Sequence, residues 1–334
     1  MKLKDEQKIE LLRYLLLNRL VEDRLAILYR QGKILGGLYL SRGQEAISVG
    51  TAYALEPHDV VGPMIRNMGA LLVRGMTPRD VFLQYLGRAE SPTGGRENAH
   101  HIGDLRGKGV VAPISMLGKM ISILMGVSMS FKLRGEKRVA VNYIGEGGAS
   151  AGDFHEALNM AGVFKLPFIL IVENNQYAYS TPVARQTAAH HISDRAAGYG
   201  IHGEIVDGND VVKVFEATRQ AAGRARSGEG PSLIECMTMR MKGHAEHDDA
   251  RYVPSELFGK WEKRDPIGLF KKKMLKEEIL TKAEIEVIEA DIKAQVEKDV
   301  DYAMAAPMPD GSGAAEGVYA DPLGWNPQRG WNGA

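Results

Sequence analysis

The chain has 334 residues, enough for one large α/β domain with helical additions or for two smaller domains. Its hydrophobic fraction of 44% and charged fraction of 25% are those of an ordinary soluble protein. Lys+Arg and Asp+Glu both number 42, so a formal net charge of zero gives no electrostatic reason to expect nucleic acid or an anionic membrane as partner.

The N-terminal ten residues, MKLKDEQKIE, are charged and lack the apolar core of a signal peptide. No stretch of the sequence reaches the roughly 20 apolar residues that a membrane span needs. The single cysteine, Cys236, lies in the apolar run SLIECM, so we expect a buried thiol and no intrachain disulfide. These features predict a cytoplasmic protein.

The first predicted element is a helix from about Asp5 to Arg30. Its apolar residues cover more than one face: Leu12, Leu15, Leu16, Val21, Leu25 and Leu28. A helix this apolar is usually packed on several sides. Either the rest of its own fold or another subunit would supply those contacts.

Short helices alternate with turns from Gly43 to Gly87, and Thr77 and Asp80 are typical of helix starts. The turn-rich run SPTGGRENAHHIGD then predicts a surface loop. A long helix is expected from about Pro113 to Leu133, where methionines alternate with small residues. Core packing is the simpler interpretation of this pattern, and a subunit interface is the alternative.

The central region alternates between apolar strands and helices. The expected strands are Arg138–Ile144, Phe168–Val172, Ile201–Val206 and Ser232–Arg240, and the expected helices are Ala149–Lys165 and Asn209–Ser227. This alternation predicts parallel βαβ units with right-handed crossovers. Because the strands are apolar throughout, we expect an α/β fold whose parallel sheet is covered by helices on both faces.

A polar loop that contains histidines, MKGHAEHDDARYVP, follows the last strand. Two further helices are expected at about Ser255–Lys273 and Thr281–Asp299, and the last thirty residues, rich in Gly, Pro and Ala, are expected to be irregular. The predicted organisation is an N-terminal helical extension at residues 1–42, an α/β domain at 43–250, and C-terminal helices with a tail at 251–334.

Gly145-Glu146-Gly147-Gly148 stands where a predicted strand ends and a helix begins. Open α/β sheets bind ligands at the carboxyl ends of their strands, and helix N-termini favour phosphate. Two common nucleotide-binding loops are excluded. Ser150 stands where a dinucleotide fingerprint needs glycine, and Gly118-Lys119 is not followed by the Ser or Thr of a P-loop.

Glu146 would repel a bound diphosphate unless a divalent cation lay between them. Magnesium takes one or two protein oxygens together with substrate phosphates. The next strand end carries Asn174-Asn175, and Asn175 follows Glu146 by 29 residues, the length of one βαβ passage. A simple turn at the two asparagines is the alternative. The spacing favours a metal site with Glu146 and Asn175 as ligands.

The run GEGGASAGDFHEALNMAGVFKLPFILIVENNQYAYSTP resembles the thiamine-diphosphate motif of 2-oxo acid dehydrogenases. The chain is similar to the alpha subunit of their first, decarboxylating component, in the pyruvate, branched-chain 2-oxo acid and acetoin dehydrogenase family. The similarity runs from about residue 10 to 300 and includes GQEAISVG, RNMGALLVRG, VDGNDV, MRMKGHAEHDD and WEKRDPI. None of these segments specifies the substrate.

The resemblance implies roles for single residues. Metal ligands would be the side chains of Glu146 and Asn175 and the carbonyl of Tyr177. The remaining cofactor-binding positions are Arg66, Ser115, Leu117, Gly145, Gly147, Gly148, Ala149 and His244. In the family Arg66 follows a tyrosine, which is Ile65 here. His244 and, less directly, His101 match active-site histidines, whereas His100, His190, His191 and His247 are expected to be solvated. A regulatory phosphoserine of animal relatives is replaced by Ala245.

The resemblance also implies partners. No segment resembles the domain that carries the family's cofactor-activating glutamate, which lies on a separate beta subunit. We therefore expect an α2β2 assembly that transfers an acyl group to the lipoyl domain of an acyltransferase core, with subunit contacts at the apolar N-terminal helix and the Met-rich helix. An acetoin dehydrogenase subunit and a non-catalytic cofactor-binding or structural subunit are the alternatives. A nicotinamide oxidoreductase is disfavoured by Ser150 and Glu146.

Overall fold

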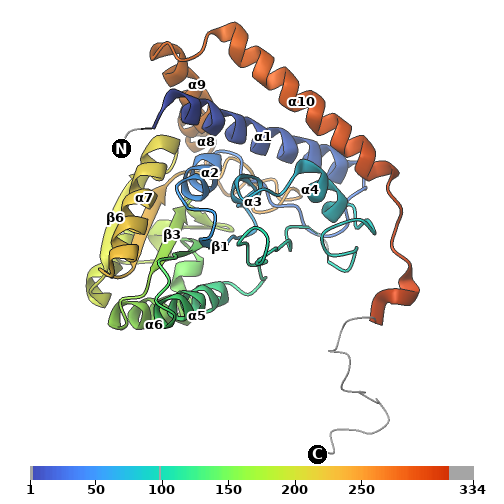
Figure 1. Ribbon diagram of the computed structural model, residues 1–334. Coiled ribbons are helices and arrows are strands. Elements are labelled where there is room, and N and C mark those ends of the chain that lie inside the picture. The colour runs from blue at the N-terminus through green and yellow to red at the C-terminus, as the bar shows by residue number, and fades with distance from the viewer. Residues whose placement is uncertain (1–2, 98, 316–334) are drawn as a thin grey trace, which may run out of the picture.

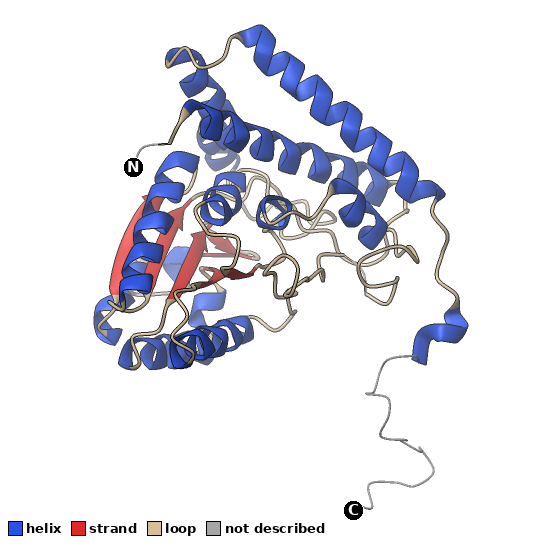
Figure 2. Cartoon of the chain, viewed as in Figure 1, coloured by secondary structure: helices blue, strands red, loops and turns tan. Residues whose placement is uncertain are grey.

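A five-stranded parallel sheet in the order β1-β2-β3-β7-β6 forms the centre of the protein (Figure 2). The computed structural model describes residues 3–97 and 99–315. The strands are β1 (Val60–Gly62), β2 (Ala140–Gly145), β3 (Phe168–Asn174), β6 (His202–Asp207) and β7 (Ser232–Met237). The four strands expected from the sequence are confirmed to within a few residues. The edge strand β1 has three residues and was not expected.

Helices cover both faces of the sheet, as the apolar strands predicted. Along β3, Ile169 and Ile171 belong to one hydrophobic cluster, together with residues of α2 (Glu45–Tyr53) and α7 (Val211–Ser227). The alternate residues Phe168, Leu170 and Val172 belong to a second cluster, with residues of α5 (Lys119–Leu133) and α6 (Gly152–Val163). Successive side chains of a strand point to opposite faces, so an apolar strand feeds two cores. The predicted α/β fold class is confirmed.

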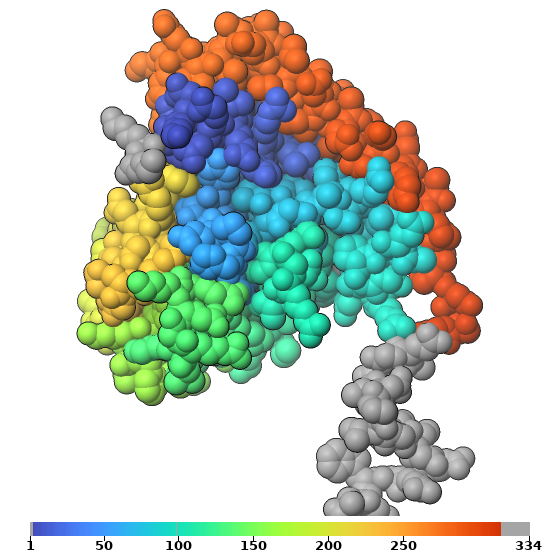
Figure 3. Space-filling view, in the orientation of Figure 1, coloured from blue at the N-terminus to red at the C-terminus, as the bar shows by residue number. Residues whose placement is uncertain are grey.

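The N-terminal helix α1 (Asp5–Arg30) lies alongside the C-terminal helix α10 (Lys282–Ala305), as Figures 1 and 3 show. Leu12, Leu15 and Leu25 of α1 are completely buried within this one chain. The rest of the fold therefore supplies the contacts that the apolar pattern required. A subunit contact elsewhere on α1 stays a prediction.

The other helices differ from the predictions mainly at their ends. They are α3 (Met68–Val73), α4 (Pro78–Tyr85), α8 (Ser255–Glu262) and α9 (Pro266–Lys276), with short 3-10 turns at Gly148–Ser150, Val183–Arg185, Ile192–Tyr199 and Gly311–Ala315 and a small hairpin of β4 (Tyr177–Ala178) and β5 (Thr181–Pro182). The helix expected at 255–273 is two helices, because Asp265 caps a new one that begins with a proline. Helix α5 starts at Lys119 rather than Pro113, since Gly118 has a φ of 89°.

Two smaller expectations, at Thr77 and at Cys236, are confirmed. Thr77 caps α4, with its hydroxyl accepting from the Asp80 amide at 3.1 Å, and Cys236 is buried, as predicted. One hydrophobic cluster contains residues from 3–40, 46–236 and 267–306, so it crosses both predicted boundaries. The division of the chain at residues 42 and 250 therefore stays a prediction.

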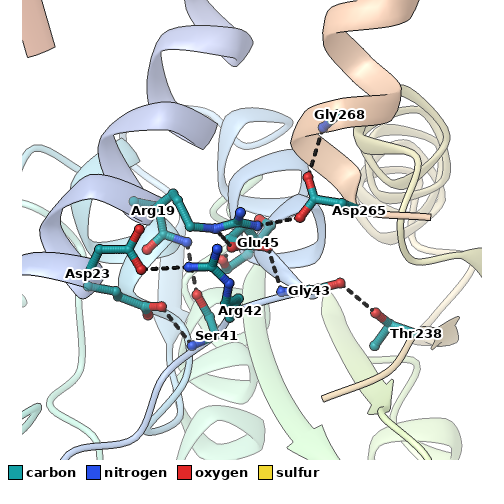
Figure 4. A network of polar contacts seen from close by, with 12 residues as sticks. Arg19, Asp23, Ser41, Arg42, Gly43, Glu45, Thr238, Asp265 and Gly268 are labelled. Atoms are coloured by element: carbon teal, nitrogen blue, oxygen red, sulfur yellow. Dashed lines mark hydrogen bonds and ion pairs between the residues drawn. The ribbon is translucent and has the colours of Figure 1, made fainter. Parts of the chain in front are cut away.

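A partly buried polar network joins α1 to the turn at 41–45 (Figure 4). Arg19 bonds Glu45 at 2.5 Å and Asp265 at 2.8 Å, and Glu45 is completely buried. The carbonyl of Gly43 accepts from the Thr238 hydroxyl at 3.0 Å, just after β7. The network therefore fixes the chain at the carboxyl end of a central strand.

Within the described part of the chain, no helix is long and apolar enough to cross a membrane.

Candidate functional site

A cavity of about 670 Å³ opens at the carboxyl ends of β2 and β3. Its walls include the predicted residues Arg66, Ser115, Leu117, Gly145, Glu146, Gly147, Gly148, Asn175, Tyr177 and His244. These residues come from five separate segments of the chain and meet where an open α/β sheet is expected to bind its ligand.

Glu146 and Asn175 lie together in this cavity, as their spacing predicted. In the β2–β3 ladder Gly145 pairs with Glu173, so both strands end at the same level. The Glu146 carboxylate accepts from the Asn175 amide at 3.2 Å, and Glu146 is 1% exposed. Burial raises the pKa of Glu146, which means that the anion lacks full compensation among the surrounding groups.

Tyr177 and Arg240 form the neighbouring wall. The carbonyl oxygen of Tyr177 accepts from Arg240 Nη1 at 3.0 Å, and the Arg240 Nη2 group bonds the Tyr179 carbonyl and the Tyr252 hydroxyl, each at 2.8 Å. Arg240 is only 2% exposed. Sequence reasoning missed Arg240, although its place just beyond a central strand was a usable signal.

The two glycines after Glu146 are needed for close packing. A Cβ atom on Gly147 would lie 2.4 Å from the Ala178 Cβ, and one on Gly148 would lie 2.5 Å from Ile144 Cδ1. By contrast, nothing lies within 4 Å of a Cβ built on Gly145. Ala149, which was expected to face the ligand, is completely buried and lies outside the cavity lining. Ala149 lies in a 3-10 turn, and its contact with the ligand stays a prediction.

Arg66 and His244 also line the cavity and contact each other. Arg66 Nη2 donates to the His244 carbonyl, lies 3.4 Å from His244 Nδ1, and the guanidinium is 5.8 Å from the Tyr39 ring centre. Burial, followed by the charges of Arg66 and Arg240, lowers the pKa of His244 to about 4. The imidazole is therefore neutral at pH 7 and offers one donor and one acceptor. Ile65 also lines the cavity.

The positions of the two adjacent histidines differ from the expectation, because His100 rather than His101 lines the cavity. His101 lies behind the wall, with Nε2 3.3 Å from the Ser115 hydroxyl and Nδ1 3.1 Å from Glu97. His100, expected to be solvated, is 6% exposed and lines the cavity. The loop folds back over the cavity, which its composition could not reveal. His190 and His247 are exposed, as expected, whereas His191 is partly buried.

Glu173 is a second buried carboxyl group in the cavity, and sequence reasoning missed it. It is 2% exposed, and its Oε1 accepts from the Asn67 side-chain amide at 2.7 Å. Burial raises the pKa of Glu173 to about 7. A glutamate at the end of an otherwise apolar strand was the signal that could have identified it.

The donor set at Glu146 fits a hard cation. It consists of a carboxylate, the side-chain oxygen of Asn175 and a backbone carbonyl, the oxygen ligands that magnesium shares with phosphates. Within residues 3–97 and 99–315, no cluster of three or more His, Cys, Asp or Glu side chains could hold a metal ion alone. The oxygens of a diphosphate would add to this donor set.

Comparisons with known proteins agree with this geometry. Residues 13–312 match the family model described as "Dehydrogenase E1 component". The chain is 38% identical to "2-oxoisovalerate dehydrogenase subunit alpha" of Bacillus subtilis (strain 168), covering 95% of this chain and 97% of that one. It is 38% identical to "Pyruvate dehydrogenase E1 component subunit alpha" of Bacillus cereus (89% and 78% covered) and 37% identical to the Staphylococcus aureus (strain Mu50 / ATCC 700699) protein of that name (89% and 79%). The resemblance inferred from the sequence is confirmed, and the chain belongs to the dehydrogenase E1 component family.

Proposed function

We propose that the chain is the alpha subunit of a thiamine-diphosphate-dependent 2-oxo acid dehydrogenase and that it holds the cofactor through magnesium. The observation that carries the proposal is the buried carboxylate of Glu146, which lies beside Asn175 at the carboxyl end of β2 and whose charge the surrounding groups do not fully offset. A divalent cation would offset that charge and also the charge of a diphosphate.

Each of the three proposed metal ligands contributes one kind of oxygen atom. Glu146 and Asn175 contribute side-chain oxygens, and the Tyr177 carbonyl keeps a second lone pair beyond its bond to Arg240. Gly147 and Gly148 line the diphosphate end, and Gly145 lies beside them. Ser115 and Leu117, which also line the cavity, would contact the aminopyrimidine.

When bound, thiamine diphosphate supplies the electron sink that decarboxylation of a 2-oxo acid requires. Arg66 is buried and cationic, and it holds the loop of His244 through that residue's carbonyl. Neutral His244 donates or accepts a proton near the diphosphate end of the cavity. His101 acts as a positioning residue, because it reaches the cavity lining through the Ser115 hydroxyl and the His100 ring.

A beta subunit completes the site in this proposal. The alpha-subunit names of the relatives support such a partner, and we propose an α2β2 assembly in the cytoplasm that serves a lipoyl-bearing acyltransferase core. Large apolar side chains stay exposed on or beside α5 and α6: Ile123, Leu133, Met160, Val163 and Phe164. This surface, which includes the Met-rich helix, is where we place a subunit contact.

We propose the chemical class of the substrate, a 2-oxo acid, rather than an individual compound. Relatives named for 2-oxoisovalerate and for pyruvate are equally similar, at 38% identity. A panel of pyruvate, branched 2-oxo acids and acetoin with an artificial electron acceptor, applied to the chain coexpressed with its beta partner, separates the candidates. Decarboxylation at full rate by the alpha chain alone would contradict the split site.

Glu146→Gln tests the metal assignment. We expect the variant complex to lose magnesium-dependent binding of thiamine diphosphate in calorimetry, because the amide carries no charge for the cation. Glu156→Gln is the matched control, since Glu156 is exposed on the helix that follows. Wild-type affinity in Glu146→Gln would rule out Glu146 as a ligand.

A further inference from the structure

His100 is a buried polar side chain without a partner in the described protein. It is 6% exposed, and neither ring nitrogen has a hydrogen-bond partner among the described residues. Its ring packs edge-on against Tyr39, with centroids 5.6 Å apart, and against His101 at 4.5 Å. These contacts hold the ring by its carbon edges and leave its hydrogen-bonding capacity unused.

Such an arrangement is costly unless a ligand completes it. Buried donors and acceptors are nearly always paired in native proteins, and an unpaired one carries the full penalty of desolvation. His100 lines the same cavity as Glu146, Asn175 and His244. A molecule bound in that cavity is therefore positioned to supply the missing partner.

The charges near His100 indicate what kind of molecule this is. Burial, followed by the neighbouring His101 and Arg66, lowers the pKa of His100 to about 3, so the ring is neutral. Arg66 and His100 both pack against Tyr39, since the guanidinium carbon lies 5.8 Å and the His100 ring centre 5.6 Å from the centre of the Tyr39 ring. A cationic neighbourhood with a free donor favours an anionic oxygen ligand.

We propose that His100 donates a hydrogen bond to the carboxylate of the 2-oxo acid substrate, beside Arg66 in the cavity wall. This inference rests on the proposed function and deepens it, because it assigns a substrate-recognition residue. It also favours a 2-oxo acid over acetoin, a neutral molecule that would leave the cationic wall without a counter-charge.

The test uses the complex with its beta partner, loaded with thiamine diphosphate and magnesium. His100→Leu removes both nitrogens, His100→Gln keeps one donor and one acceptor, and His247→Gln is the exposed control. Binding of oxamate, an unreactive carboxylate analogue of pyruvate, is measured by calorimetry. We expect His100→Leu to weaken oxamate binding by about tenfold or more, and His100→Gln to recover part of it.

Kinetics supply the second readout. In His100→Leu, KM for the preferred 2-oxo acid should rise by about tenfold, whereas kcat/KM for acetoin and the affinity for thiamine diphosphate should not change. Unchanged oxamate binding, or an equal loss of cofactor affinity, would overturn the inference. If the wild-type complex fails to bind thiamine diphosphate, the proposed function fails first, and this is seen before oxamate is added.

Stability separates recognition from a structural role. Replacing an unpaired buried polar group by an apolar group of similar size is nearly neutral or stabilising. We therefore expect the melting temperature of His100→Leu to equal or exceed that of the wild type. A fall of several degrees would identify His100 as a structural residue and contradict the proposal.

Discussion

Arg240 Nη1 donates to the carbonyl oxygen of Tyr177 across 3.0 Å, and this bond ties the segment after β7 to the hairpin after β3. The same guanidinium reaches Tyr179 and Tyr252, so a planar fork holds three groups at once. The backbone that carries a proposed metal ligand is thus held by a residue 63 positions away in the chain.

Arg240→Lys should therefore weaken magnesium-dependent binding of thiamine diphosphate by about tenfold, because an ammonium group cannot reproduce the forked contacts. Calorimetry on the complex measures the change. Arg251→Lys is the control, since Arg251 is 89% exposed and pairs only with Asp249 at the surface. Equal affinities for the two variants would show that the Tyr177 carbonyl needs no such support.

Gly147→Ala should lower the free energy of unfolding by about 1 to 3 kcal/mol, because the added methyl would lie 2.4 Å from the Ala178 Cβ. Gly145→Ala, which meets nothing within 4 Å, is the matched control and should be nearly neutral. The double variant Gly147→Ala/Ala178→Gly should regain much of the loss. Urea unfolding measures all three, and failure of the second change to restore stability would refute the clash.

Arg19→Met should cost about 3 to 5 kcal/mol, since it leaves the buried Glu45 carboxylate without its cation. Adding Glu45→Gln should restore part of the stability. Arg24→Met is the comparison: its partner Glu297 is 46% exposed, so the expected loss is at most about 1 kcal/mol. Similar urea midpoints for the two single variants would argue against a dominant role for the network in Figure 4.

Glu22 should make stability depend on pH. Burial, followed by the charge of Glu45, raises the pKa of Glu22 to about 8, against 4.5 for an ordinary glutamate. Between these two pH values the folded state keeps the Glu22 proton, whereas the unfolded state releases it. The free energy of unfolding is therefore highest below pH 4.5 and falls as the pH rises to about 8. Glu22→Gln should gain on the order of 2 kcal/mol over the wild type between pH 5 and 8.

Urea unfolding at several pH values measures that gain. Glu262→Gln is the control, because Glu262 is exposed on α8. Parallel pH profiles for wild type and Glu22→Gln would mean that Glu22 is ionised in the folded protein.

Local pattern was sufficient for the elements that build the metal end of the site. The strands around Glu146 and Asn175 are continuous apolar runs, and the interval between them is one βαβ passage, so their meeting at one sheet edge followed from spacing. Pro266 marks a break that is also visible in the sequence, although the sequence analysis predicts a single helix there. The edge strand β1 escaped notice because three residues carry no periodicity.

The sequence by itself determined the parallel sheet, the family and the pair Glu146 and Asn175, because each depends on residues close along the chain. Only the tertiary structure decided that Arg240 holds Tyr177, that α10 packs against α1, and that His100 instead of His101 faces the cavity. Loops and long-range packing bring these residues together. Their burial depends on how distant segments fold over one another, which no local pattern records.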